Sequence, residues 1–326
     1  MFPAQRPRRL RRTAALRRLV AETSLNPSDF VAPLFVAEGL DEPRPILSLT
    51  GHVQHTLTSL HDEVKALTSA GVTSVLLFGV PAAKDELGSG AWDREGIAQV
   101  AIRSLKDAFG DDLVVMADLC LDEYTTHGHC GVVRSDGSVD NDATIELYAR
   151  VALAQAEAGA DVVAPSGMMD GQVMEIRDAL EESSFAETII LAYAVKYASA
   201  LYGPFREAVG VEIAGGGNRR GYQQDPSNRR ESLLEARADV NEGADIVMVK
   251  PAMTNLDVVS DLKRELDVPV AAYHVSGEYA MVKAAAANGW IDGTAVAIEQ
   301  LTAIRRAGAD FVLTYFAREL AEELSR

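Results

Sequence analysis

The 326-residue sequence predicts a single (β/α)8 barrel, or TIM barrel, with an extended N-terminal arm. Three observations favour this fold class. A helix end, a glycine and a short apolar run rich in β-branched residues follow one another four times along the chain. About eight such apolar runs occur in total, and helical periodicity fills most of the gaps between them. Eight parallel strands with intervening helices most simply close into a barrel, and an open doubly wound sheet is the alternative.

The repeated phrase contains the glycines at positions 71, 159, 243 and 308, as in NEGADIVMVKP and RAGADFVLTYF. A glycine suits the left-handed position that ends a helix, and the apolar run after it suits a strand buried on both faces. No G-x-G-x-x-G motif follows an early strand, which disfavours a dinucleotide-binding open sheet. The predicted strands cover residues 30–36, 73–80, 113–120, 161–166, 188–195, 245–250, 269–275 and 310–316.

Composition argues against several classes of protein. A hydrophobic share of 48% with 24% charged residues is ordinary for a soluble enzyme with a large core. The net charge of −17 disfavours non-specific nucleic-acid binding, which needs a basic surface. Two cysteines make no disulfide framework, so we expect a reducing, cytoplasmic location. No apolar window is long enough to span a membrane, and the N-terminus lacks the apolar core of a signal peptide.

Residues 1–25 are predicted to form an arm outside the barrel domain, which covers residues 26–326. The first 18 residues hold seven arginines and no acid. Such a segment suits an acidic surface, and we expect it to lie on a neighbouring subunit rather than to remain a disordered tail.

Active-site residues of such a barrel lie at or just after the C-terminal ends of its strands. Polar side chains at these positions come from different strands and should converge on one mouth. They are Asp118, Cys120, Ser166, Lys196, Lys250, His274, Ser276 and Tyr315.

Lys196 and Lys250 end consecutive predicted strands in a chain that has only seven lysines. A lone lysine at a strand end is more often a surface residue or an ion-pair partner. Two together predict an amine nucleophile, because burial and a nearby cation both favour the neutral amine that attacks a ketone or aldehyde. Arginine cannot take this role because it stays protonated.

Arginines follow the Lys196 strand. Arg206 lies in GPFR, and Arg219 and Arg220 lie near Gln223 in the glycine-rich stretch GGGNRRGYQQDP. Paired arginines suit bidentate recognition of a carboxylate. The same stretch also fits a flexible connector with solvated arginines, or a phosphate nest, although no Walker motif accompanies it.

The stretch LCLDEYTTHGHCG, residues 119–131, holds both cysteines, two acids and two histidines. Taken alone, it leaves open a zinc site, a disulfide, a catalytic thiol and an ordinary loop. A disulfide conflicts with the expected reducing compartment, and a catalytic thiol is redundant because the lysines already supply a nucleophile.

With these residues assembled, the chain closely resembles the 5-aminolevulinate dehydratase family, also called porphobilinogen synthase. The matching stretches run in order along essentially the whole chain, and their combination is highly specific. They are RPRRLRR, ADLCLDEYTTHGHCG, APSGMMDG, AYAVKYASALYGPFR, GYQQDP, VMVKPAM and YHVSGEYAM.

The resemblance implies a lyase that condenses two 5-aminolevulinate molecules, with loss of two waters, to porphobilinogen for tetrapyrrole (heme) biosynthesis. Lys250 would form a Schiff base with one molecule, and Lys196 would hold or activate the second. Residues that match the family's motifs would supply the other contacts: Asp118 and Ser166 to the second amino group, Arg206, Arg219 and Gln223 to the second carboxylate, Ser276 and Tyr315 to the first carboxylate, and Tyr273 against the Schiff base.

The resemblance also bears on metals. Zinc-using members carry three cysteines where this chain has Cys120, Asp122 and Cys130, and zinc-independent members tend to carry Ala, Asp and Asp. Two thiolates, a carboxylate and a water would suit tetrahedral zinc, although the carboxylate should weaken binding. A bound zinc, a weak divalent site and an absence of metal all stay open. His129 would support this site without ligating, and His127 suits a structural role in the loop.

Two further family properties concern assembly. Part of the family binds an allosteric magnesium near a glutamate that matches Glu235, whose alternative interpretation is a solvated helix face. The arginine-rich arm matches the family's subunit-embracing arm, which implies a homo-octamer or a related homo-oligomer.

The chain departs from the family pattern in a few places. Gly167 and Gln172 lie in SGMMDGQ where the family usually has SDMMDGR, and SLTGH at 48–52 replaces an SMPGV-type turn. VMVKPAM for the commoner VMVKPGM is a minor change. We therefore expect different local contacts at these segments.

Two other functions stay open. A class I aldolase-like lyase also uses a Schiff-base lysine on a barrel, but it needs neither a second lysine nor the Cys/Asp/Cys set. A non-catalytic oligomeric scaffold predicts the loss of Lys196 or Lys250, and the chain has both.

Overall fold

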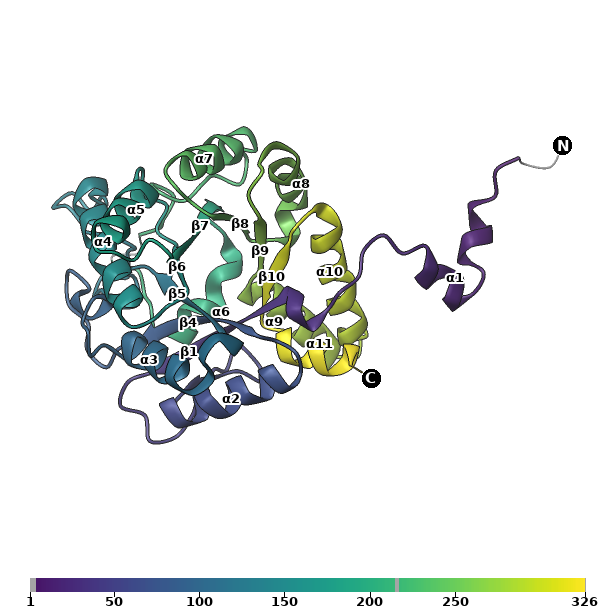
Figure 1. Cartoon of the computed structure of the whole chain (residues 1–326), viewed down its shortest axis with the longest axis horizontal. Helices are drawn as coiled ribbons and strands as arrows, with labels where there is room; N and C mark the ends of the chain where they lie inside the picture. Colours follow the sequence, from purple (N-terminus) through teal and green to yellow (C-terminus); the bar gives the residue numbers. More distant parts are fainter. Residues whose placement is uncertain (1–3, 215–216, 326) are drawn as a thin grey trace.

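The computed structural model describes residues 4–214 and 217–325 and contains the predicted barrel. Figure 1 shows the strands as a ring with helices around it. Each of the eight predicted apolar runs forms a strand of this ring, so the predicted fold class is confirmed. The strands are β1 (Phe30–Ala37), β4 (Ser74–Val80), β5 (Val114–Leu119), β6 (Val162–Pro165), β7 (Ile189–Lys196), β8 (Ile246–Lys250), β9 (Val270–His274) and β10 (Phe311–Thr314).

The sheet closes on itself. All neighbouring strands of the ring are parallel, and β1 pairs with β10 through Phe30↔Val312 and Val31↔Leu313. Every residue of β1, β6 and β9 is buried, as expected for strands with side chains inside the barrel on one face and helices on the other. The open doubly wound sheet is therefore wrong for this chain.

The four glycines of the repeated phrase have the predicted conformation. Gly71, Gly159, Gly243 and Gly308 all have positive φ, between +91° and +127°. Because side-chain-bearing residues rarely adopt this backbone conformation, glycine lets each helix stop and the chain turn directly into the next strand.

The helices follow the predicted periodicity. In α2, for example, the buried residues Leu60, Val64 and Leu67 recur every three or four positions, and Thr56 caps the helix by accepting a hydrogen bond from Ser59 N. The remaining longer helices are α3 (Ile97–Phe109), α4 (Asn141–Glu157), α5 (Gln172–Glu182), α6 (Gly203–Val209), α7 (Arg230–Asn241), α8 (Leu256–Glu265), α9 (Ser276–Ala287), α10 (Gly293–Ala307) and α11 (Ala317–Leu324), with α2 at Leu57–Ser69.

Two short strands that periodicity did not predict lie between β1 and α2. They are β2 (Arg44–Pro45) and β3 (Val53–His55), and β3 extends the sheet beside the end of β1. The intervening 48–52 segment packs against the barrel end, because Tyr279 donates a hydrogen bond to Thr50 O and His52 contacts Tyr315 O. The segment at 48–52, which departs from the family pattern, thus contacts α9 and the residue that follows β10.

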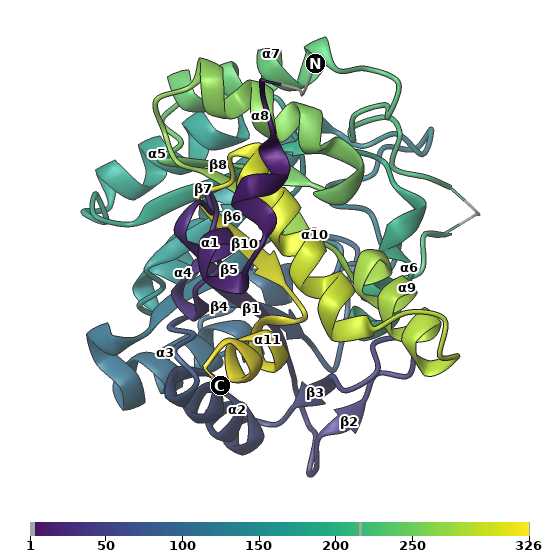
Figure 2. The ribbon, with the colours of Figure 1, turned by 90° about the vertical axis from the view of Figure 1, so that its right-hand side faces the viewer.

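The N-terminal segment runs away from the barrel in Figure 1, and in Figure 2, viewed from that side, it lies in front of the barrel. It contains a short 3-10 helix at Pro7–Arg11 and α1 at Ala14–Leu19. From residue 4 to residue 20, every side chain except that of Leu16 is exposed. Residues 1–3 of the predicted arm, and residue 326, lie outside the described part of the chain.

No helix among the described residues is both long enough and apolar enough to cross a membrane.

Candidate active site

The carboxyl ends of β5 to β10 bring most of the predicted polar residues together. Lys196 and Lys250 end the neighbouring strands β7 and β8 and face each other in the strand register. Both side chains are buried, with 5% of each residue exposed. The alternative of a surface residue or an ion-pair partner, which a lone lysine would favour, does not describe either of them.

The amine of Lys250 lies among aromatic rings. Its Nζ is 4.4 Å from the centre of the Tyr273 ring, and between 5.1 and 5.2 Å from the ring centres of Tyr193, Tyr202 and Phe205. Burial, together with the positive charge of Lys196, lowers the pKa of Lys250 from 10.5 to about 7. A large fraction of this amine is therefore neutral near pH 7.

Lys196 has a different environment. Its Nζ donates a 2.6 Å hydrogen bond to Ser166 O. Burial acts to lower the pKa of Lys196, but Coulombic interactions with Cys130, Cys120 and Asp122 in their ionised forms raise it by more in total. The result is a pKa above the usual value of 10.5, so Lys196 stays protonated at neutral pH.

Asp118 and Ser166 lie beside this amine. Ser166 Oγ donates a 3.1 Å hydrogen bond to Asp118 Oδ2. Burial raises the pKa of Asp118 to about 6, although Lys196 and Lys250 both act to lower it. The carboxyl group is therefore close to its titration point under mildly acidic conditions.

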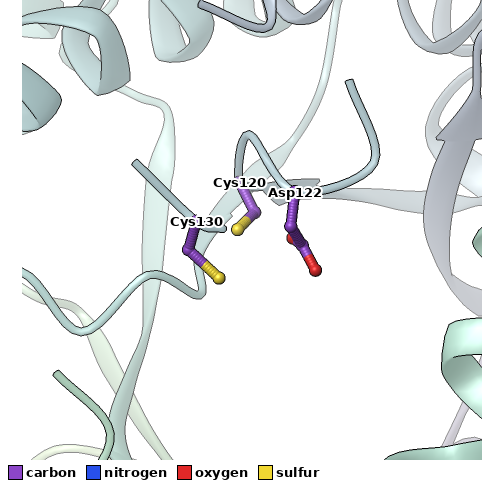
Figure 3. A group of neighbouring side chains, drawn as sticks. All are labelled: Cys120, Asp122 and Cys130. Carbon is purple, nitrogen blue, oxygen red and sulfur yellow. The ribbon is translucent and has the colours of Figure 1, made fainter. Parts of the chain in front are cut away.

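The two cysteines and Asp122 form a buried cluster. One ligand atom from each of Cys120, Asp122 and Cys130 lies within 4.8 Å of the others, and Figure 3 shows the three side chains beside one another. Both cysteines are free, so a disulfide is wrong. Two thiol sulfurs and a carboxylate oxygen, close together and shielded from water, match the donor types that zinc prefers. The residues present thus fit a divalent metal ion.

Asp122 already has a cationic partner. Arg219 Nη2 donates a 2.6 Å hydrogen bond to Asp122 Oδ2, and only 8% and 4% of the two side chains are exposed. Burial would raise the pKa of Asp122, but Arg219 and Lys196 outweigh it and hold this pKa well below the usual value.

The structure brings the predicted carboxylate-binding residues together. Arg206, Arg219 and Gln223 line one pocket of about 260 Å3, which Arg220 also borders. Gly215 and Gly216 of the glycine-rich stretch lie outside the described residues.

The residues predicted for the first carboxylate contact one another or neighbouring elements of the barrel mouth. The Tyr273 and Tyr315 hydroxyls are 3.2 Å apart. Ser276 Oγ accepts a hydrogen bond from Phe205 N and contacts Leu201 O, so it connects α9 to the segment that precedes and begins α6.

Three predicted residues lie elsewhere. His274 Nε2 is 2.9 Å from Gln300 Oε1 on α10, so this side chain faces the helix layer and not the barrel mouth. Glu235 lies on α7 beside a second pocket of about 470 Å3, which Asp170 and Glu231 also line and which shares Arg220 and Gln223 with the first pocket. Burial and the charges of Asp170 and Glu231 raise the pKa of Glu235.

His127 contacts Glu86 O and accepts a hydrogen bond from His129 N, as a loop histidine would.

Sequence reasoning missed the neighbours that support residues 119–131, which we call the metal loop. His129 Nδ1 is 3.2 Å from the Tyr222 hydroxyl, which also accepts a hydrogen bond from Cys130 N. The Tyr148 hydroxyl donates a 2.7 Å hydrogen bond to Cys130 O and lies 3.7 Å from Cys120 Sγ. Both tyrosines lie far along the chain from the loop and carried no local signal.

Tyr148 also explains the departure at Gly167. A Cβ atom at this glycine would lie 1.8 Å from the Tyr148 hydroxyl oxygen. The space that a side chain would need is therefore filled by the tyrosine beneath the metal loop. Gln172, the other departure, uses its Oε1 to accept a hydrogen bond from Met169 N in the same turn.

A closed barrel with two buried lysines at its mouth, one of them with a pKa lowered to about 7, is the arrangement expected of an enzyme whose lysine attacks a carbonyl group to form a Schiff base. Comparison with known proteins narrows this class. A sequence model of the family described as delta-aminolevulinic acid dehydratase matches residues 4–323. The chain belongs to this family, as its motifs predicted.

Relatives named delta-aminolevulinic acid dehydratase match along nearly their whole length. One from Mycobacterium tuberculosis is 58% identical over 98% of this chain and 97% of the relative. One from Bacillus subtilis is 49% identical over 98% of each chain. A crystal structure of delta-aminolevulinic acid dehydratase (porphobilinogen synthase) from Toxoplasma gondii ME49, in complex with the product porphobilinogen, is similar in fold. Its TM-score is 0.96 at 42% identity, over 98% of this chain and 92% of that one.

Proposed function

We propose that this chain is a porphobilinogen synthase in which Lys250 is the nucleophile and Lys196 remains a charged positioning group. The observation that carries the proposal is the opposite electrostatic setting of two neighbouring buried lysines. Burial and Lys196 lower the pKa of Lys250 to about 7, whereas Cys130, Cys120 and Asp122 in their ionised forms raise the pKa of Lys196. Family membership supplies the substrate, 5-aminolevulinate.

The first covalent step follows from the neutral amine of Lys250. Its nitrogen lone pair attacks the ketone carbon of one 5-aminolevulinate, and proton transfer to the oxygen allows water to leave as the imine forms. The rings of Tyr193, Tyr202, Phe205 and Tyr273 surround the amine and exclude water, which protects the imine from hydrolysis.

The second 5-aminolevulinate is bound on the Lys196 side. The protonated Lys196 donates hydrogen bonds and polarises the oxygen of this molecule, while Asp118 and Ser166 accept from and orient its amino group. Asp118, with a pKa of about 6, is also suited to accept a proton from that amino group. Holding both molecules in one pocket makes their condensation an oriented, effectively unimolecular reaction.

Two separate groups of residues hold the carboxylate tails. Arg206, Arg219 and Gln223 share the 260 Å3 pocket and suit the second carboxylate. The hydroxyls of Ser276 and Tyr315 suit the first, with Tyr273 packed beside the imine. These tails fix which carbon atoms of the two molecules meet.

Cys120, Asp122 and Cys130 would hold a divalent metal, with zinc favoured by the two sulfur donors. When bound, such an ion supplies Lewis acidity near the second molecule. The Glu235 pocket, lined by Asp170 and Glu231, is the place we propose for a regulatory magnesium ion.

We also propose that the chain works in the cytoplasm as a homo-octamer or related homo-oligomer, with residues 1–25 as an inter-subunit arm. The exposed arginines of this segment and the net charge of −17 for the whole chain support contact between the arm and a second copy. Light scattering of the full chain and of a variant that lacks residues 1–25 tests this point.

Borohydride trapping tests the proposed chemistry. Reduction in the presence of 5-aminolevulinate should fix a substrate adduct to Lys250, which peptide mapping would locate, and a colour assay should detect porphobilinogen from the untreated enzyme. An adduct without porphobilinogen would favour an aldolase-like lyase. No adduct and no product would favour a non-catalytic barrel.

A further inference from the structure

Arg219 connects the two halves of the proposed chemistry. It comes from the segment between α6 and α7, yet its guanidinium reaches the metal loop, where Nη2 donates to Asp122 Oδ2 at 2.6 Å and to Gly128 O at 2.8 Å. The same side chain lines the 260 Å3 pocket that suits a substrate carboxylate. One arginine therefore has two possible carboxylate partners.

Asp122 likewise has two possible partners, a metal ion and Arg219. Its carboxylate is one of the three groups of the buried metal cluster, together with Cys120 and Cys130, and it is also the ion-pair partner of Arg219. A metal ion and a guanidinium at this carboxylate would be two cations at close range in a site that water does not screen. Their mutual repulsion makes simultaneous binding unfavourable.

We propose that Arg219 and a divalent metal ion compete for the carboxylate of Asp122, so that metal binding releases Arg219 to hold a substrate carboxylate. The release to substrate rests on the proposed function, whereas the competition itself involves only groups of this chain and a metal. Arg219 is thus a positioning residue whose partner depends on the metal content of the loop.

The competition predicts a gain of metal affinity when the arginine loses its charge. Arg219→Gln should lower the zinc dissociation constant by about tenfold, because one buried positive charge beside the ligands is removed. The measurement is competition with a chromogenic chelator on the full chain without substrate. An unchanged or weaker affinity in this variant overturns the proposal.

Matched variants separate the contact from a general charge effect. Arg220→Gln removes the same charge from the next, exposed position and should change zinc affinity by less than about threefold. Arg219→Lys keeps the positive charge, so its zinc affinity should also stay close to that of the parent protein. In an Asp122→Asn background, Arg219→Gln should have less than about a threefold effect, and a full tenfold gain there would contradict competition through Asp122.

A second readout needs no substitution. If zinc displaces Arg219 from Asp122, zinc should increase the rate at which phenylglyoxal modifies Arg219 relative to Arg220, as followed by peptide mass spectrometry. Equal or slower modification of Arg219 would contradict the proposal. Because neither readout contains 5-aminolevulinate, this proposal can fail while borohydride trapping on Lys250 succeeds, and the reverse also holds.

Discussion

The two sides of the barrel mouth shift the pKa of a buried lysine in opposite directions. On the β8 side, Lys250 lies among Tyr193, Tyr202, Phe205 and Tyr273, and its pKa falls to about 7. On the β7 side, Lys196 lies near the cysteines and Asp122, and its pKa rises. The lysines are register partners on adjacent strands, so their surroundings and not their backbone positions set the difference.

This contrast divides the chemistry between the lysines. A neutral amine is needed for attack on a ketone, and a charged amine is needed to bind and polarise oxygen. The charge on Lys196 also helps to keep Lys250 neutral. The two sides of the mouth thus depend on each other, and the following changes test each side in turn.

The largest effect is expected from the loss of the nucleophile. Lys250→Ala should lower kcat by on the order of a thousandfold or more, because no other described lysine has a lowered pKa beside the rings of the pocket. A porphobilinogen colour assay measures the rate. Retention of the borohydride adduct in this variant would place the Schiff base elsewhere.

Removal of the second lysine should have a smaller, two-part effect. Lys196→Gln should lower kcat by roughly a hundredfold through lost positioning and polarisation. It should also raise the pKa of Lys250, because a nearby positive charge no longer disfavours its protonated form. The pH–rate profile should therefore move to higher pH, whereas a purely structural role for Lys196 would leave the profile in place.

The parent enzyme should show the lowered pKa directly. Below pH 7, the neutral fraction of Lys250 falls about tenfold per pH unit, so the rate of imine formation should fall with it and level off above pH 7 to 8. Single-turnover trapping across this range measures the step. A rate that keeps rising to pH 10 would indicate an ordinary lysine.

A substitution in the metal loop should strengthen a property of the protein, its retention of zinc, instead of weakening one. Asp122→Cys replaces a hard carboxylate with a soft thiolate and should tighten zinc retention against a chelator by about tenfold. Zinc remaining after dialysis with chelator gives the measurement. Unchanged retention would mean that Asp122 is not a ligand.

A substitution at Gly167, next to the metal loop, should have the smallest effect on activity but a clear effect on stability. Gly167→Ala should lower the free energy of unfolding by about 1–3 kcal/mol, because its Cβ would overlap the buried Tyr148 hydroxyl. Gly203→Ala is the control, since no atom lies within 4 Å of a Cβ built there. Equal urea midpoints for both variants would show that the Tyr148 site relaxes freely.

The fold could be predicted because its signals are local. Each strand is a short apolar run, four of these runs follow a helix-ending glycine, and the carboxyl ends of the strands in a parallel barrel meet at one face. This rule placed Lys196 and Lys250 together. The rule was wrong for His274. Successive strand residues face opposite sides of the sheet, so because Tyr273 faces Lys250, His274 faces the helix layer.

The surroundings of the lysines could not be predicted in the same way. Tyr202 and Phe205 reach Lys250 only because the segment after β7 folds back over the barrel mouth. The Arg219–Asp122 pair joins residues 97 positions apart, and Tyr148 reaches the metal loop from α4. Such contacts depend on three-dimensional packing and leave no periodic signal in the sequence.

The central claim is that about half of Lys250 is neutral at pH 7, whereas Lys196 stays charged. Competitive labelling with trace acetic anhydride, mapped by peptide mass spectrometry from pH 5 to 11, compares both amines in the same protein. The account predicts that labelling of Lys250 reaches half its maximum near pH 7 while Lys196 stays unreactive beyond pH 10. Parallel labelling of the two lysines would contradict it.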